Sequence, residues 1–196
     1  MNLPNKLSIL RILLIPVFTV FFFLPQIPFN YVISASIFAI AAATDFLDGH
    51  IARKYNLVTN LGKFIDPIAD KALVATALII LITNPIITLG CAVGFNCTVI
   101  FSVGVAIILV RELMISGFRM IAAKQQVVLA ADKIGKAKTF VTDFAIAFLL
   151  VGLDLCCLAQ KIVLITGYVL FAVGVILTVV SGVNYIVKNK QILSDN

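Results

Sequence analysis

The sequence predicts an all-α integral membrane protein, a bundle of six transmembrane helices. Hydrophobic residues make up 62% of the 196 residues and charged residues 12%, which is about half the charged share of a soluble domain. The mean hydropathy is +1.14, so a soluble core of this size could not bury the apolar surface. The apolar runs do not alternate with a period of two, which favours helices over a membrane β-barrel.

Prolines, asparagines and charges divide the chain into six apolar segments of about the length that one bilayer crossing needs. The expected spans are Ser8–Leu24, Asn30–Tyr55, Leu61–Thr83, a segment within Leu89–Ala123, Gly135–Leu153 and Lys161–Val187. The fourth segment is longer than one crossing, so its end is expected to project into the interface. No repeat or linker interrupts the pattern, which indicates one domain over residues 1–196.

Basic residues fall on alternate connections. They precede the first span, lie between spans two and three and spans four and five, and follow span six. The connection between spans five and six holds only Lys161, and the other two connections hold none. The positive-inside rule therefore predicts that both termini are cytoplasmic, in a multi-pass protein of the cell membrane. The net charge of +6 is attributed to these edges and to anionic lipid, and not to nucleic acid.

Four of the nine acidic residues lie between Asp45 and Asp70. Asp45 and Asp48 are spaced i, i+3, and Asp66 and Asp70 are spaced i, i+4, so each pair lies on one face of its helix. A short turn makes the two helices antiparallel neighbours, which brings four carboxylates together just inside the cytoplasmic leaflet. Such carboxylates repel one another, and a divalent cation relieves the repulsion. All-oxygen ligation suits Mg²⁺, Mn²⁺ or Ca²⁺, and Mg²⁺ often also binds substrate phosphates.

Residues between the two pairs fit a phosphate-bearing substrate. Gly49 and Ala52 leave a small-residue patch for a flat group, and Arg53 offers a bidentate fork for phosphate. Gly62 allows the two helices to approach closely. A structural polar network, an ion pathway or a cation-coupled transporter are the alternatives, although transporters favour midplane sites and repeated halves, and neither is seen in this sequence.

The string Asp-x2-Asp-Gly-x2-Ala-Arg-x8-Gly-x3-Asp-x3-Asp, Asp45 through Asp70, resembles the signature of the CDP-alcohol phosphatidyltransferase family at every position. The resemblance implies that family's six-helix membrane fold, a homodimer and a site for two metal ions, Mg²⁺ or Mn²⁺. It also implies roles for individual residues. The metal ligands would be Asp45, Asp48, Asp66 and Asp70, with Asp70 also the general base, and the CDP contacts would be Asp48, Gly49, Ala52, Arg53 and Gly62.

A second group of cations bears on the acceptor alcohol, which differs among members of that family. Arg111 and Arg119 lie on broadly one helical face with Ser116 between them, and Lys136 and Lys138 open the fifth span. These residues are predicted to bind a phosphate on the acceptor, as glycerol 3-phosphate or inositol phosphate carries. The alternative is that four lysines, Lys124, Lys133, Lys136 and Lys138, simply anchor the cytoplasmic edge.

Further segments resemble family members that use glycerol 3-phosphate. They are Asn2–Asn5 with Leu10-Arg11, Asp66–Lys71, Arg111–Arg119, Ala122-Ala123 and Gly135–Thr139. The expected reaction transfers the phosphatidyl group of CDP-diacylglycerol to a hydroxyl of glycerol 3-phosphate and releases CMP. Inositol phosphate, serine and phosphatidylglycerol stay open as other acceptors.

Three features have no fixed role from the sequence. Arg11 lies within the first span and either extends along the helix to the membrane edge or reaches the phosphate site. Asp143 is predicted to pair with a cation near the site. The four cysteines, Cys91, Cys97, Cys156 and Cys157, are expected to be small packing residues.

Overall fold

The computed structural model describes residues 3–54, 60–88, 98–124 and 133–189, and side chains within 5–44, 65–88, 98–122 and 134–189. Everything regular in these residues is helical. The helices are α1 (Leu3–Phe22), α2 (Asn30–Lys54), α3 (Asn60–Thr83), α4 (Pro85–Thr88), α5 (Thr98–Lys124), α6 (Lys133–Asp154) and α7 (Cys157–Lys188).

Each of the six long helices overlaps one predicted segment, although α1 begins at Leu3 and not at the predicted Ser8. Among the described residues, three of them are long and apolar enough to cross a membrane: Asn5–Phe22, Thr98–Ala122 and Cys157–Lys188. The predicted stop at Asn84-Pro85 is confirmed, because α3 ends at Thr83 and the short α4 begins at Pro85. The sixth helix begins earlier than predicted, so Lys161 lies inside α7 and not in the connection before it.

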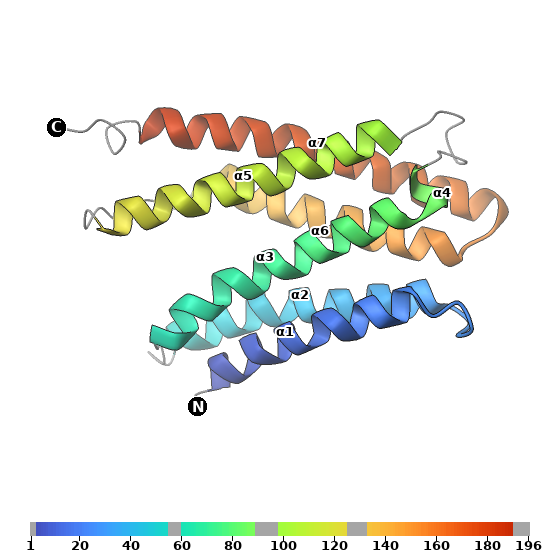
Figure 1. The fold of residues 1–196 in the computed structure, drawn as a ribbon, viewed down its shortest axis with the longest axis horizontal. Helices are drawn as coiled ribbons and strands as arrows, with labels where there is room; N and C mark the ends of the chain where they lie inside the picture. Colours follow the sequence, from blue (N-terminus) through green and yellow to red (C-terminus); the bar gives the residue numbers. More distant parts are fainter. Residues whose placement is uncertain (1–2, 55–59, 89–97, 125–132, 190–196) are drawn as a thin grey trace.

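The helices run along one common direction as an elongated bundle (Figure 1). The start of α1 and the end of α7 lie at the same end, where α2 ends and α3 begins (Figure 1). We call this the basic end, because Lys6, Lys63 and Lys188 lie on the helix termini there. The charge distribution read from the sequence is therefore gathered at one end of the fold.

Apolar side chains hold the bundle together along its length. Phe18 of α1 meets Phe38 of α2 edge to face at 6.3 Å, and Phe101 of α5 stacks on Phe171 of α7 at 4.4 Å. The α6 residues Ile146 and Leu149 are fully buried among the helices. α1 packs along both α2 and α3, and more extensively than these two pack on each other.

Polar contacts close the end of the bundle opposite the basic end. The Asp154 carboxylate, at the end of α6, accepts a hydrogen bond of 2.6 Å from the backbone N–H of Val32 in the first turn of α2. Carboxylates satisfy free N–H groups at helix N-termini in this way. Cys156 and Cys157 lie at this end and are exposed, so their prediction as packing residues is wrong. Cys91 and Cys97 lie outside the described residues.

The close approach of α6 and α7 depends on glycine. A Cβ on Gly167 would lie 2.8 Å from Leu149 Cδ2 and 3.2 Å from the backbone nitrogen of Leu149. We expect Gly167→Ala to lower the free energy of unfolding by about 1–3 kcal/mol, because the helices must separate to admit the methyl group. Thermal unfolding in detergent measures this loss.

Gly117→Ala is the matched control, because a Cβ there meets nothing within 4 Å. Alanine at this helical position should raise stability by about 0.5–1 kcal/mol through helix propensity. Equal effects of the two substitutions would contradict the packing argument.

Candidate active site

The predicted α3 carboxylates lie one turn apart near the basic end. Asp66 accepts a hydrogen bond of 2.5 Å on Oδ1 from the hydroxyl of Ser8, which belongs to α1 and is fully buried. Asp70 is half-buried and lies on the wall of a cavity of about 230 Å³ bounded by α3, α5 and α6. The i, i+4 spacing thus places both carboxylates toward the inside of the bundle.

The α2 half of the predicted cluster lies on the last turns of that helix. Asp45, Asp48, Gly49, Ala52 and Arg53 all fall within α2, and their side chains, like Gly62 at the start of α3, lie outside the described residues. Their roles stay predictions. The described turn just before them ends at Thr44, which is buried.

Arg11 does not extend along the helix surface to the membrane edge. Its side chain is fully buried, and Nε lies 3.2 Å from the carbonyl oxygen of Ala41 and 3.4 Å from Thr44 Oγ1. These contacts place Arg11 against the turn of α2 that precedes Asp45, and the alternative that it reaches the phosphate site stays a prediction.

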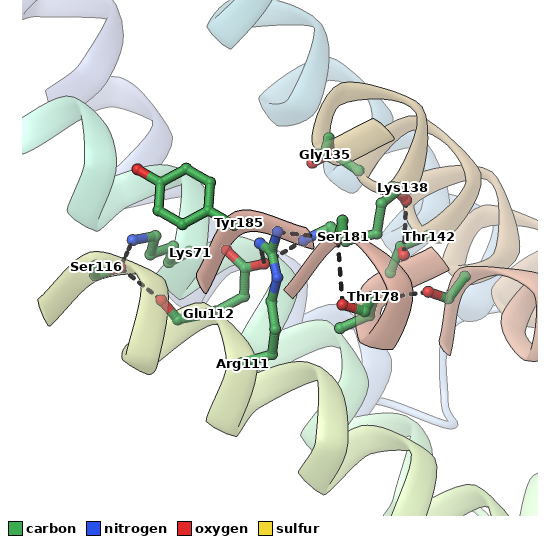
Figure 2. Close-up of polar contacts among 12 residues, drawn as sticks. Lys71, Arg111, Glu112, Ser116, Gly135, Lys138, Thr142, Thr178, Ser181 and Tyr185 are labelled. Carbon is green, nitrogen blue, oxygen red and sulfur yellow. Dashed lines mark hydrogen bonds and ion pairs between the residues drawn. The ribbon is translucent and has the colours of Figure 1, made fainter. Parts of the chain in front are cut away.

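The acceptor-side residues form a network that joins three helices (Figure 2). The Glu112 carboxylate of α5 forms ion pairs with Lys138 of α6 and, at 3.0 Å, with Arg111. Arg111 Nη2 donates at 3.0 Å to Ser181 of α7. Glu112 had no role in the sequence-based prediction, yet its carboxylate joins two of the predicted phosphate-binding residues.

Ser116 and Lys71 extend this network toward α3. Ser116 accepts a hydrogen bond from the Lys71 ammonium and donates at 2.6 Å to the Glu112 carbonyl (Figure 2). Lys71 was missed as a site residue. The signal available in the sequence was its position directly after Asp70, the last residue of the acid motif.

Arg119 and Lys136 lie at the margin of the network. Arg119 is exposed, donates at 3.4 Å to the Tyr185 hydroxyl of α7, and lies over that ring at 5.8 Å. Lys136 is exposed whereas Lys138 is buried, because residues two apart on a helix do not face each other. The structure therefore brings Arg111, Ser116 and Lys138 together and leaves Lys136 outside the group.

The cavity places three carboxylates and two lysine ammonium groups on one surface. Its lining includes Asp70, Lys71, Glu112, Lys138 and Asp143. A second, apolar hollow of about 510 Å³ lies between α2 and α6 and shares Asp143. Its other lining residues are Phe38, Ala39, Ala42, Ala43, Phe140, Phe144 and Ala147. A polar compartment and an apolar one thus meet at Asp143, and its pairing with a cation stays a prediction.

The feature of the network that favours an anion is a donor on Arg111 that is free among the described residues, because the other charges are largely balanced. Arg111 and Lys138 form ion pairs with Glu112, and Lys71 donates to Ser116. The cavity wall holds the carboxylates of Asp70, Glu112 and Asp143 beside Lys71 and Lys138. Arg111 Nε is buried and has no hydrogen-bond partner among the described residues. A buried donor without a partner costs free energy, so an anionic ligand that accepts from it would be favoured.

The described donors fit a hard divalent cation. Asp66 and Asp70 supply only carboxylate oxygens, the ligands that Mg²⁺ and Mn²⁺ prefer. Within the described side chains no group of three or more His, Cys, Asp and Glu comes together. The α2 aspartates that would complete such a group lie outside that set.

A family model described as CDP-alcohol phosphatidyltransferase matches residues 1–180, and the chain belongs to this family. Its curated relatives include proteins named CDP-diacylglycerol–glycerol-3-phosphate 3-phosphatidyltransferase. The one from Bacillus subtilis is 38% identical over 98% of this chain and 97% of its own length. Those from Rickettsia bellii and Salmonella typhimurium are 35% and 34% identical, each over 94% of this chain and 93% of the relative.

Proposed function

We propose that this protein transfers the phosphatidyl group of CDP-diacylglycerol to glycerol 3-phosphate, giving phosphatidylglycerol phosphate and CMP, in phospholipid biosynthesis. The observation that supports it most is the polar compartment, where Asp70 and the cations Lys71 and Lys138 line one cavity. The relatives' names and the family membership agree with this reading.

In the proposed reaction Asp70 accepts the proton from the primary hydroxyl of glycerol 3-phosphate. The hydroxyl oxygen then forms a bond to the β-phosphorus of CDP-diacylglycerol, and the bond from that phosphorus to the CMP oxygen breaks. CMP leaves, and the lipid product stays in the membrane. The acceptor phosphate would be bound by Arg111, Arg119, Lys138, Lys136 and Ser116, of which Arg119 and Lys136 are the least supported because both are exposed.

Asp48, Gly49, Ala52, Arg53 and Gly62 are proposed to hold the CDP group of the donor. The apolar hollow between α2 and α6 is lined on α2 by residues that precede this segment, from Phe38 to Ala43, and we propose that it receives the acyl chains. Two divalent cations, Mg²⁺ or Mn²⁺, would be held by Asp45, Asp48, Asp66 and Asp70 and would neutralise charge on the donor phosphates.

The proposal includes a membrane arrangement. The six long helices would form one domain that crosses the cell membrane six times, with both termini and the site at the cytoplasmic face. The gathering of basic residues at one end supports this orientation, and the resemblance to the family supports a homodimer.

An acceptor panel tests the reaction. With Mn²⁺ or Mg²⁺ and CDP-diacylglycerol, purified protein should release CMP when glycerol 3-phosphate is added, and should release much less with inositol phosphate, serine or phosphatidylglycerol. Faster CMP release with another acceptor would still support the family's reaction but would contradict glycerol 3-phosphate as the acceptor. Absence of CMP release with every acceptor would overturn the transferase reading, and ion flux in liposomes without donor lipid would then favour a transporter.

A further inference from the structure

The N-terminal half of α1 carries a buried polar stripe. Asn5, Ser8 and Arg11 are spaced three residues apart and are 5%, 0% and 0% exposed. Residues at this spacing lie on adjoining positions of one helical face. Polar groups are buried in an apolar helix only where they have hydrogen-bonding partners. This face of α1 therefore contacts polar groups of the neighbouring helices.

The stripe reaches both helices that carry the acid motif. Ser8 Oγ lies 2.5 Å from Asp66 Oδ1 of α3. Arg11 Nε contacts Ala41 and Thr44 of α2, in the turn before Asp45. Among the described residues α1 packs on α2 and α3 more extensively than they pack on each other, so its polar stripe contacts both helices that carry the acid pairs.

We propose that Ser8 is a positioning residue for the metal-binding carboxylates, a role that rests on the proposed function. Its hydroxyl holds one oxygen of Asp66 and so fixes the orientation in which the other oxygen faces the cluster. Arg11, on the same face, fixes the α2 turn that leads into Asp45. Groups that orient a ligand in this way change metal affinity by about 10–100-fold when they are removed.

The test measures Mn²⁺ binding to the purified full-length protein by the loss of the free Mn²⁺ signal in electron paramagnetic resonance. Ser8→Ala should raise the Kd for Mn²⁺ about tenfold and shift the Mn²⁺ concentration needed for half-maximal CMP release by the same factor. Ser8→Thr keeps the hydroxyl and should restore most of the affinity.

Ser34→Ala is the matched control. Ser34 is also fully buried, and its hydroxyl reaches from α2 to the Phe18 carbonyl of α1 at 3.3 Å, away from the acids. Ser34→Ala should leave the Kd for Mn²⁺ unchanged. This result would separate an effect on the orientation of Asp66 from an effect on the packing of α1 against α2.

An unchanged Kd in Ser8→Ala, or an equal rise in Ser34→Ala, overturns the inference while CMP release by the wild-type protein still supports the transferase. Lack of Mn²⁺ binding by the wild type overturns it too. Lack of CMP release by the wild type overturns the proposed function, whatever the binding result.

Discussion

Asp70→Asn is expected to lower the rate of CMP release by about 10²–10⁴-fold, the contribution typical of a general base. Asparagine has nearly the same size, but its amide cannot accept the proton of the acceptor hydroxyl. Asp70 is half-buried on the wall of the cavity that Lys71 and Lys138 also line, so the proposed base and two lysine ammonium groups face one volume. Donor binding should survive, because the residues proposed to hold the CDP group lie on α2 and at the start of α3.

Two measurements separate these effects. CMP release gives the rate, and the rise in thermal unfolding temperature caused by CDP-diacylglycerol reports donor binding. Asp154→Asn is the control, since it makes the same chemical change at the opposite end of the bundle, where the residue accepts a hydrogen bond from Val32. It should lower stability modestly and keep turnover. A full rate in Asp70→Asn would remove Asp70 from the proton transfer.

The helices could be predicted from the sequence because their ends are marked locally. Asn84-Pro85 stops α3, and charges bracket α6, so signals within a few residues were sufficient. The start of α7 at Cys157 could not be read, because no capping side chain marks it: the N-cap Cys156 forms no side-chain hydrogen bond. Local composition sets helix boundaries only where a breaker or a cap is present.

The candidate site was predictable in part for a related reason. Periodicity places Asp66 and Asp70 on one face of one helix, and the structure places Asp70 on the cavity wall. Periodicity does not say which side chain of a distant helix meets that face. The contacts of Ser8 with Asp66 and of Glu112 with Lys138 join residues 58 and 26 positions apart, and they depend on the packing of whole helices. Arg11 shows the same limit, because its burial follows from two neighbouring helices and not from its own.

Arg111→Gln is expected to raise the KM for glycerol 3-phosphate by about 10–100-fold, with a smaller change in kcat and little change in the KM for CDP-diacylglycerol. Hydrogen bonds to a charged group contribute about 1.5–3 kcal/mol, and a tenfold change corresponds to about 1.4 kcal/mol. Arg111 binds Glu112 and Ser181 through its two terminal nitrogens, and its buried Nε has no hydrogen-bond partner among the described residues, so Nε is the proposed donor for the acceptor phosphate. Arg111→Lys keeps the charge but loses this fork, so it should recover only part of the affinity.

The control for net charge is Lys161→Gln. Lys161 is exposed and lies near the start of α7, at the opposite end from the network, so both kinetic constants should stay at their wild-type values. Thermal unfolding distinguishes an effect on binding from an effect on folding. If Arg111 acts only through its contact with Ser181, its loss should lower the unfolding temperature and raise the KM of both substrates together. Equal rises in the KM for the acceptor and for the donor would show that Arg111 holds α5 against α7 and does not bind the acceptor phosphate. A rise in the KM for glycerol 3-phosphate alone would support binding of its phosphate by the cations paired with Glu112, which are Arg111 and Lys138.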